Sequence, residues 1–181
     1  MACLTMAMED TPYQDLLGNI HMDLLGEKGK QHNGEFHTPP SICTFMAQLT
    51  MAQHQWPEHG EMTVCEPACG AGAQILALAE VVGKERLHRL RVQAIDISSL
   101  ACDMCFINTT LWGIPTVVIH GNSLSCESWN AWPNFHMLMN APFSYRRWMS
   151  IRATNPEPPQ PQAAIHPSPP VAIPILQLEL F

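Results

Sequence analysis

The stretch Thr63-Val64-Cys65-Glu66-Pro67-Ala68-Cys69-Gly70-Ala71-Gly72-Ala73 decides the fold. Its first residues predict a short strand, its middle is a turn of small residues, and the apolar residues 74–82 predict a helix. Gly70 and Gly72 let the backbone approach a ligand closely, and the first turn of a helix carries N–H groups without intrahelical partners. This order is typical of a cofactor site, although any tight turn between a strand and a helix shares it.

Three further strands are predicted downstream of this turn. The strands and the polar residues that follow them are 91–95 with Asp96, 116–119 with Asn122, and 135–139 with Asn140. Asp96 stands at about the distance after the glycines at which an acid binds a ribose hydroxyl in dinucleotide-binding folds. A plain helix cap is the alternative, because serines follow it. Strands that end in such turns predict an open α/β sheet whose ligands lie beyond the carboxyl ends of the strands.

Two amphipathic helices are predicted before the glycine turn. Apolar residues recur at helical spacing in 12–25, and again in 41–53 after a pair of prolines. We expect both helices to pack on one face of the sheet. The polar residues 27–33 are predicted to form a linker between them.

The tetrapeptide Asn140-Ala141-Pro142-Phe143 resembles the Asn-Pro-Pro-aromatic motif of amino-group methyltransferases, with alanine in place of the first proline. In that motif an amide oxygen and a backbone carbonyl accept hydrogen bonds from an exocyclic NH2 group, and the aromatic ring stacks on the base. A strand end followed by an ordinary Asn-Xaa-Pro turn is the alternative reading.

Together these motifs resemble the S-adenosylmethionine-dependent DNA adenine-N6 methyltransferases, especially the modification subunits of type I restriction systems. The resemblance covers residues 15–143. Residues 15–18 and 21–25 look like the family's N-terminal helix, and Gly34-Glu35-Phe36-His37-Thr38-Pro39 is similar to its Gly-(Gln/Glu)-Phe-(Phe/Tyr)-Thr-Pro segment. Because that segment precedes the cofactor turn, the order favours DNA adenine as the target over glutamine side chains or RNA bases.

The resemblance implies a site and a reaction. S-adenosyl-L-methionine would contact Phe36, Thr38, Pro39, Glu66, Pro67, Gly70, Gly72, Asp96 and Asn122, and Asn122 stands where the family usually has aspartate. Asn108 matches a recurring asparagine of the helix after Asp96. Asn140, Ala141, Pro142 and Phe143 would receive an adenine flipped from the duplex, with direct in-line methyl transfer to N6. Ala141 removes a fixed φ, so we expect activity to be weakened or lost.

The chain is predicted to have four segments: an N-terminal helical cofactor lid at 1–60, an α/β core that binds S-adenosylmethionine at 61–153, a proline-rich linker at 154–176, and a docking peptide at 177–181. Proline is the commonest residue of 156–174, which is typical of an extended spacer and excludes central strands. The Rossmann-like methyltransferase sheet is therefore expected to be incomplete. A partner or a second copy would cover its apolar edge, or the chain is a truncated, degenerate product.

The last residues, Gln177-Leu178-Glu179-Leu180-Phe181, are similar to the peptide by which bacterial replication and repair proteins bind the DNA sliding clamp. Gln177 and Leu178 would contact the clamp, and Leu180 and Phe181 would be the buried anchors. An apolar tail that covers the domain's own sheet edge is the alternative. A second hypothesis follows, that of a catalytically degenerate methyltransferase-like protein that acts by binding a partner.

Composition is consistent with a single domain and limits DNA binding. The 181 residues carry a formal net charge of −7, a handicap for holding a phosphate backbone. The positive residues cluster at 84–91 and at 146–152. The second cluster could bind phosphate beside a flipped base, and a solvated helix end is the alternative. The expected partners are double-stranded DNA and either a second copy of the chain or a specificity subunit.

The cysteines are expected to be free thiols. Seven is an odd number, and the sequence shows no signal peptide and no apolar run of about 18 residues, so we predict a cytoplasmic protein without a membrane segment. Cys102 and Cys105 have the spacing of zinc ligands but no second such pair accompanies them. We therefore expect no metal.

Overall fold

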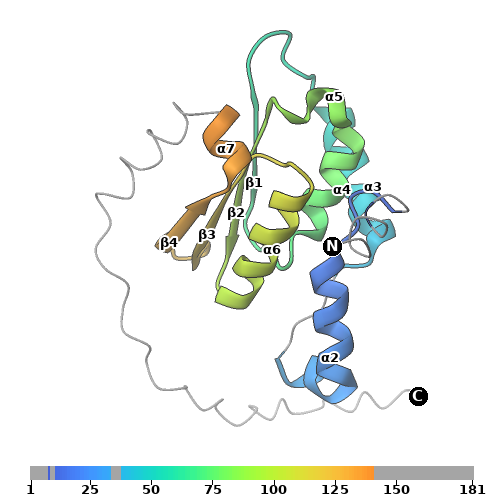
Figure 1. The fold of residues 1–181 in the computed structure, drawn as a ribbon, viewed down its shortest axis with the longest axis vertical. Coiled ribbons are helices and arrows are strands. Elements are labelled where there is room, and N and C mark those ends of the chain that lie inside the picture. Colours follow the sequence, from blue (N-terminus) through green and yellow to red (C-terminus); the bar gives the residue numbers. More distant parts are fainter. Residues whose placement is uncertain (1–7, 9–10, 34–37, 141–181) are drawn as a thin grey trace, which may run out of the picture.

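The computed structural model describes residues 8, 11–33 and 38–140. Its helices are α2 (Leu16–Asn33), α3 (Pro40–Gln53), α4 (Ala73–Val82), α5 (Lys84–Leu87), α6 (Ser99–Leu111) and α7 (Phe135–Asn140). Its strands are β1 (Met62–Glu66), β2 (Leu90–Asp96), β3 (Thr116–Asn122) and β4 (Glu127–Pro133). Helices alternate with strands along most of this part of the chain (Figure 1). The α/β class predicted from the sequence is confirmed.

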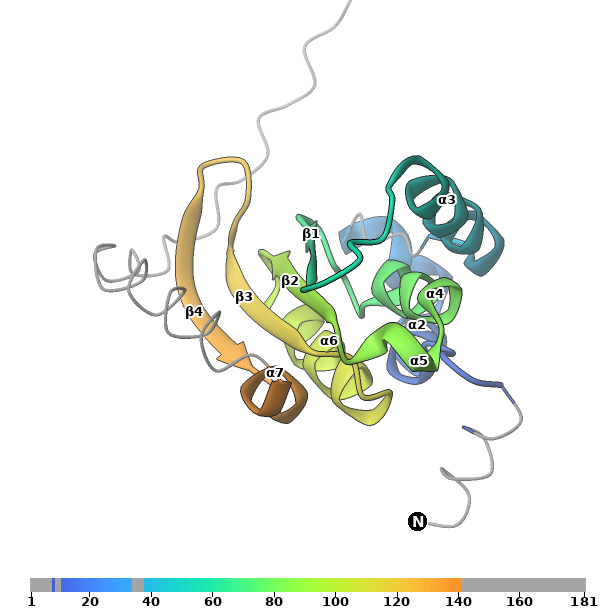
Figure 2. The same ribbon diagram turned by 90° about the horizontal axis from the view of Figure 1, so that it is seen from above.

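The four strands form one sheet in the order β1-β2-β3-β4. The first three strands are parallel, and β4 returns antiparallel to β3 after a short turn. Two crossovers in the same direction, β1-α4-β2 and β2-α6-β3, place both helices on one face if both are right-handed, as such connections nearly always are. Figure 2 shows the β3–β4 hairpin at one side of the molecule and α3 at the other.

The main core lies between the sheet and these helices. Val92 and Val118 are buried on the sheet side, and Ile75 and Leu76 are buried on α4. The cysteines of α6 belong to the same cluster. Since α4 starts at the glycine turn, this packing holds the turn at the carboxyl ends of the strands.

A smaller apolar cluster lies on the opposite face of the sheet. It contains Val117, Ile119, Ala131 and, from α7, Met137. Alternate residues of β3 therefore serve the two clusters, as expected for a strand buried on both faces. The helix that covers this second face is α7, among the residues that the structure describes.

The prediction of a strand at 135–139 is wrong, because these residues form the helix α7. The fourth strand is instead β4, and Asn134 starts the helix after it. The Asn134 side-chain oxygen accepts hydrogen bonds from the backbone N–H of Met137 at 2.9 Å and of Thr116 at 3.2 Å. A short apolar run does not distinguish a strand from a buried helix by its periodicity. The asparagine in front of it is the signal that favours the helix.

Arg91 holds the end of α7 near the amino ends of the parallel strands. Its side chain is buried, forms an ion pair with Glu61, and donates a hydrogen bond of 2.8 Å to the backbone carbonyl of Asn140. Two more of its hydrogen bonds go to the carbonyls of His88 and Leu90. The partners of this guanidinium group therefore all lie within the protein, which leaves it unsuited to contact DNA.

The basic cluster at 84–91 is largely engaged by contacts within the protein. Besides the buried Arg91, Arg89 donates hydrogen bonds to the carbonyls of Pro57 at 2.6 Å and Gly60 at 2.7 Å. Arg89 and Arg86 also both lie 5.8 Å from the centre of the Trp56 ring. Intramolecular carbonyl and ring contacts satisfy these cations, which are consequently less available to phosphates.

The N-terminal helices differ in detail from the sequence prediction. The predicted linker at 27–33 is the continuation of α2. Helix α3 packs against α4 through the buried Cys43 and Ala47. The larger apolar residues of its predicted packing stripe are exposed: Ile42, Phe45, Met46 and Leu49. Because α4 is rich in alanine, the small residues of α3 pack against it. The stripe of larger apolar residues therefore does not identify the packing face of α3.

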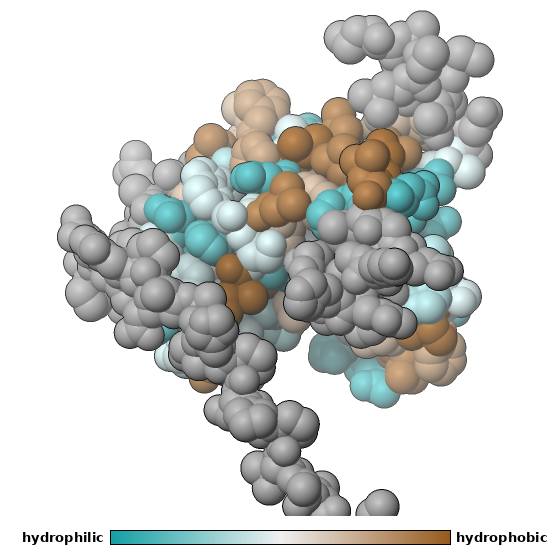
Figure 3. Space-filling view, turned by 90° about the horizontal axis from the view of Figure 1, so that it is seen from below, coloured by the Kyte–Doolittle hydropathy of each residue, from teal (hydrophilic) through white to brown (hydrophobic). Residues whose placement is uncertain are grey.

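Apolar residues are also visible on the outside of the molecule. The space-filling view from below shows them interspersed with polar ones (Figure 3). Among the described residues, no helix is long and apolar enough to cross a membrane.

Candidate cofactor site

The glycine turn between β1 and α4 has a conformation that requires glycine. Gly70 has φ +51° and Gly72 has φ +96°. Residues other than glycine rarely adopt this backbone conformation. A Cβ atom on Gly72 would also lie 3.2 Å from the sulfur of Cys105, so the turn packs closely against α6. The backbone N–H of Gly72 donates to the carbonyl of Cys69 at 2.8 Å, which closes the turn.

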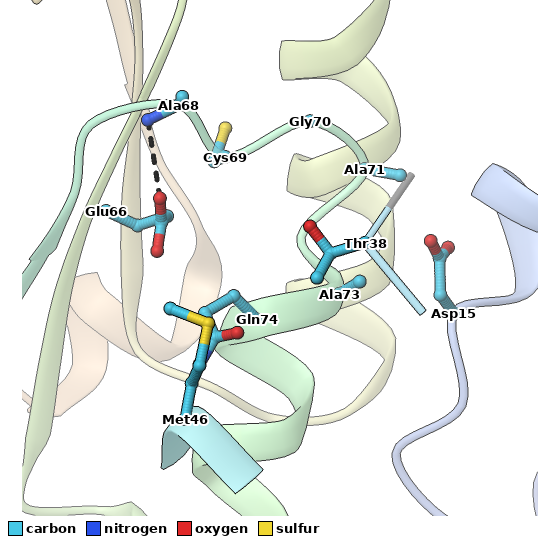
Figure 4. Close-up of a pocket in the computed structure, with 10 residues that line it drawn as sticks. All are labelled: Asp15, Thr38, Met46, Glu66, Ala68, Cys69, Gly70, Ala71, Ala73 and Gln74. Atoms are coloured by element: carbon cyan, nitrogen blue, oxygen red, sulfur yellow. Dashed lines mark hydrogen bonds between the residues drawn. The ribbon is translucent and has the colours of Figure 1, made fainter. Parts of the chain in front are cut away.

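A cavity of about 160 Å³ lies between this turn, α3 and the residues before α2. Its lining residues are Asp15, Thr38, Met46, Glu66, Ala68, Cys69, Gly70, Ala71, Ala73 and Gln74. Figure 4 shows the Glu66 and Asp15 carboxylates on opposite sides of it. The glycine turn predicted from the sequence thus borders a hollow that a ligand can enter.

A second cavity, of about 340 Å³, shares Asp15, Thr38 and Ala73 with the first. Tyr13 and Glu80 line it as well, whereas no Lys, Arg or His among the described residues lines either cavity. Ligand sites usually measure about 300–1,000 Å³. The first cavity is smaller than this, so a cofactor bound at the glycine turn would extend into the second. The acidic lining favours a cofactor with positive charge and hydroxyl groups.

Glu66 is a half-buried carboxylate at the end of β1. Burial raises its pKa above the ordinary carboxyl value, a hydrogen bond of 3.4 Å from the backbone N–H of Ala68 opposes this shift, and the nearby Asp96 charge raises the pKa further. Ligand hydroxyl groups that donate hydrogen bonds to the ionised form would stabilise it. Glu66 is thus suited to bind a sugar-like group.

Asp96 holds the glycine turn through both of its carboxylate oxygens. One accepts from the backbone N–H of Gly70 at 2.8 Å, and the other accepts from the N–H of Ser98 at 2.9 Å. Ser98 itself caps α6 through the N–H of Ala101. The position of Asp96 agrees with the sequence prediction, and its contact with a ribose stays a prediction.

The other predicted cofactor residues differ in their relation to the cavities. Thr38 lines both, and Pro39 lines the second as the residue before α3. Pro67 is exposed beside Glu66. Asn122 lies at the end of β3, where its side-chain oxygen accepts from the backbone N–H groups of residues 124 and 125. Phe36 lies outside the described residues.

The structure does not bring Asn140 to this site. Its carbonyl is bound by Arg91 at the start of β2, whereas Gly70 is bound by Asp96 at the end of the same strand. At a rise of about 3.3 Å per residue, Arg91 and Asp96 are roughly 16 Å apart along the strand. The remaining predicted catalytic residues, Ala141, Pro142 and Phe143, lie outside the described residues.

A known protein family matches most of the chain. The model of the N-6 DNA Methylase family matches residues 13–169. The chain belongs to the N-6 DNA methylase family. It is 22% identical over 111 residues to the type I restriction enzyme MpnII methylase subunit of Mycoplasma pneumoniae, a match that covers 60% of this chain and 20% of that protein. No solved structure matches the chain.

N-6 DNA methylases take their methyl group from S-adenosylmethionine, and the residues of the site fit that cofactor. The positive-φ glycines leave room for a ligand beside the backbone, Glu66 offers an acceptor for hydroxyl groups, and the acidic cavity lining suits a cation. Sequence reasoning did not assign Asp15, Met46 or Gln74 to the site. They come from three different segments, so no local pattern links them.

The thiols near the turn are suited to packing rather than to chemistry. A hydrogen bond with the Cys105 side chain and burial raise the pKa of the Cys69 thiol far above its usual range. Burial is also the main cause that raises the pKa of Cys102 to about 12. All six described cysteines are free. The described residues include no group of three or more His, Cys, Asp or Glu side chains that could hold a metal ion.

Proposed function

We propose that this chain binds S-adenosylmethionine at the glycine turn and acts as an adenine-N6 DNA methyltransferase of low activity. The observation that carries the proposal is the cavity formed by the glycine turn, Glu66 and Thr38 in a member of the N-6 DNA methylase family. Glu66 would accept hydrogen bonds from the cofactor, and Gly70 and Gly72 would allow its close approach. When bound, the cofactor supplies an electrophilic methyl group.

The acceptor side of the reaction rests on Asn140, Pro142 and Phe143. The asparagine amide and the following carbonyl would accept hydrogen bonds from the adenine N6 amino group, and the phenylalanine ring would stack on the flipped base. In-line transfer requires these residues at the same edge of the sheet as the cavity. With α7 held by Arg91 at the other edge, the segment after β4 has to move before transfer occurs. Ala141 in place of proline adds to this cost.

DNA would be held by more than this chain. The net charge is −7, and internal contacts engage Arg89 and Arg91. The type I relative is named a methylase subunit. We therefore propose that the chain works beside a specificity subunit or as a homodimer that supplies the missing contacts to double-stranded DNA.

A second candidate function is partner binding by a catalytically inactive methylase-like domain. The distance of Asn140 from the cavity favours it. Residues 177–181, outside the described residues, would be the docking peptide for a sliding clamp, with Gln177, Leu178, Leu180 and Phe181 as the contact residues. Deleting 177–181 should abolish clamp binding and leave cofactor binding unchanged.

The test is transfer of labelled methyl groups from S-adenosylmethionine to duplex DNA that lacks adenine methylation. The wild-type chain is compared with Ala141→Pro and with Glu66→Gln, and cofactor binding is measured by calorimetry for each. We expect label in N6-methyladenine, more of it with Ala141→Pro, and less with Glu66→Gln because its cofactor affinity falls. Cofactor binding without any transfer would favour the second candidate. No cofactor binding would overturn the proposal for the isolated chain.

A further inference from the structure

A single buried side chain connects the two walls of the cavity. Asn108, in the last turn of α6, has no exposed surface. Its side-chain NH2 group donates a hydrogen bond of 2.9 Å to the carbonyl of Ala71 in the glycine turn and one of 2.7 Å to the carboxylate of Asp15. The same Asp15 oxygen accepts from the backbone N–H of Gly18 at 2.8 Å, at the start of α2. We call these contacts the Asn108 bridge.

The orientation of the Asn108 amide follows from its partners. Ala71 and Asp15 both present acceptor oxygens, so a reversed amide would place its own oxygen against a carbonyl and a carboxylate. In the observed orientation the Asn108 side-chain oxygen is buried without a hydrogen-bond partner. Such a group costs about 1–3 kcal/mol. An apolar residue would avoid this cost, so the amide calls for an explanation beyond packing.

Asn108 itself lines neither cavity, whereas Asp15 and Ala71 both line the first one. Asp15 belongs to the N-terminal segment and Ala71 to the glycine turn. These walls are 56 residues apart in the sequence, yet one amide joins them. Any effect of Asn108 on a ligand must therefore pass through Asp15 and Ala71.

We infer that Asn108 is a positioning residue that couples docking of the N-terminal helix α2 to the binding of S-adenosylmethionine. The bridge holds the two walls at their binding separation before the ligand arrives, so less ordering remains to be done when it binds. Conversely, a ligand that contacts both walls stabilises the docked position of α2, because such coupling is reciprocal. This inference rests on the proposed function, since the ligand is the cofactor proposed above.

The test compares two variants of neighbouring buried residues on α6. Asn108→Leu removes the bridge and introduces an apolar side chain of similar size. Thr109→Val is the matched control, because Thr109 is equally buried and its hydroxyl bonds only to carbonyls of its own helix, those of Cys105 and Phe106. For each protein the dissociation constant for S-adenosylmethionine and the rate of trypsin cleavage within α2, at Lys28 and Lys30, are measured.

We expect Asn108→Leu to raise the dissociation constant on the order of tenfold and to speed cleavage of α2, with Thr109→Val close to wild type in both. In methyl transfer, the KM for the cofactor should rise while kcat changes little. The thermal midpoints of the two variants should be similar, which separates positioning from simple stability. Equal affinities for Asn108→Leu and Thr109→Val would overturn the inference. If the wild-type chain binds no cofactor, the proposed function fails, and cleavage of α2 alone decides whether the bridge docks the helix.

Discussion

Replacing Asp96 by asparagine should destabilise the protein before any cofactor is added. Both carboxylate oxygens accept backbone N–H groups, that of Gly70 at 2.8 Å and that of Ser98 at 2.9 Å. An asparagine has one acceptor oxygen, so its NH2 group would face one of these donors and leave it unpaired. The remaining hydrogen bond would also lose its charge.

The size of the effect follows from these two bonds. A hydrogen bond to a charged group contributes about 1.5–3 kcal/mol, and the variant loses one of two and weakens the other. We expect the free energy of unfolding to fall by about 2–3 kcal/mol, which lowers the midpoint of thermal unfolding on the order of 5–10 °C. Urea unfolding and calorimetry of the ligand-free protein measure both quantities.

The control for this prediction is Asp103→Asn, which removes the same charge from an exposed position of α6. It should change the unfolding free energy by less than about 0.5 kcal/mol. The reasoning is refuted if Asp96→Asn is as stable as this control while its affinity for S-adenosylmethionine falls sharply. That outcome would assign the carboxylate to the ligand and not to the turn.

Three further predictions concern the glycine turn and its surroundings. Gly72→Ala should cost about 2 kcal/mol because of strain and its tight contact with α6, and Gly70→Ala, which meets no atom within 4 Å, about 1 kcal/mol, both by urea unfolding. Because burial raises the pKa of Glu66, its ionisation opposes folding, so Glu66→Gln should stabilise the protein at neutral pH. This gain in unfolding free energy should vanish as the pH falls below the ordinary carboxyl pKa. An aromatic disulfide reagent should label exposed Cys126 quickly and buried Cys69 only on unfolding, as mass spectrometry of the labelled peptides would show.

Local patterns in the sequence predicted the parallel strands of the sheet and the helix after the glycine turn. The strand before the glycine turn, the helix after it, and the strands that end at Asp96 and Asn122 are all present. Each depends on apolar runs and on glycines whose backbone conformation few other residues adopt. Such signals lie within a few residues of the element that they predict.

Patterns were less reliable where a distant residue decides the outcome. The run 135–139 became a helix because Asn134 caps it and Arg91 holds its end. The cluster of positive residues at 84–91 is visible in the sequence, but the carbonyl and carboxylate partners of Arg89 and Arg91 are not. Asn134 is a local signal, whereas Arg91 lies 49 residues from Asn140 and Arg89 lies 29 residues from Gly60.

The sequence by itself determined the family, whose model matches residues 13–169. It also determined the glycine turn, because the backbone of Gly70 and Gly72 needs glycine whatever surrounds it. Only the tertiary structure decided which walls enclose the cavity and that Asn108 joins them, because hydrogen bonds between Asp15, Ala71 and Asn108 span as many as 93 residues. It also placed Asn140 at the opposite edge of the sheet. Contacts of that range depend on how whole elements pack, and no local pattern encodes them.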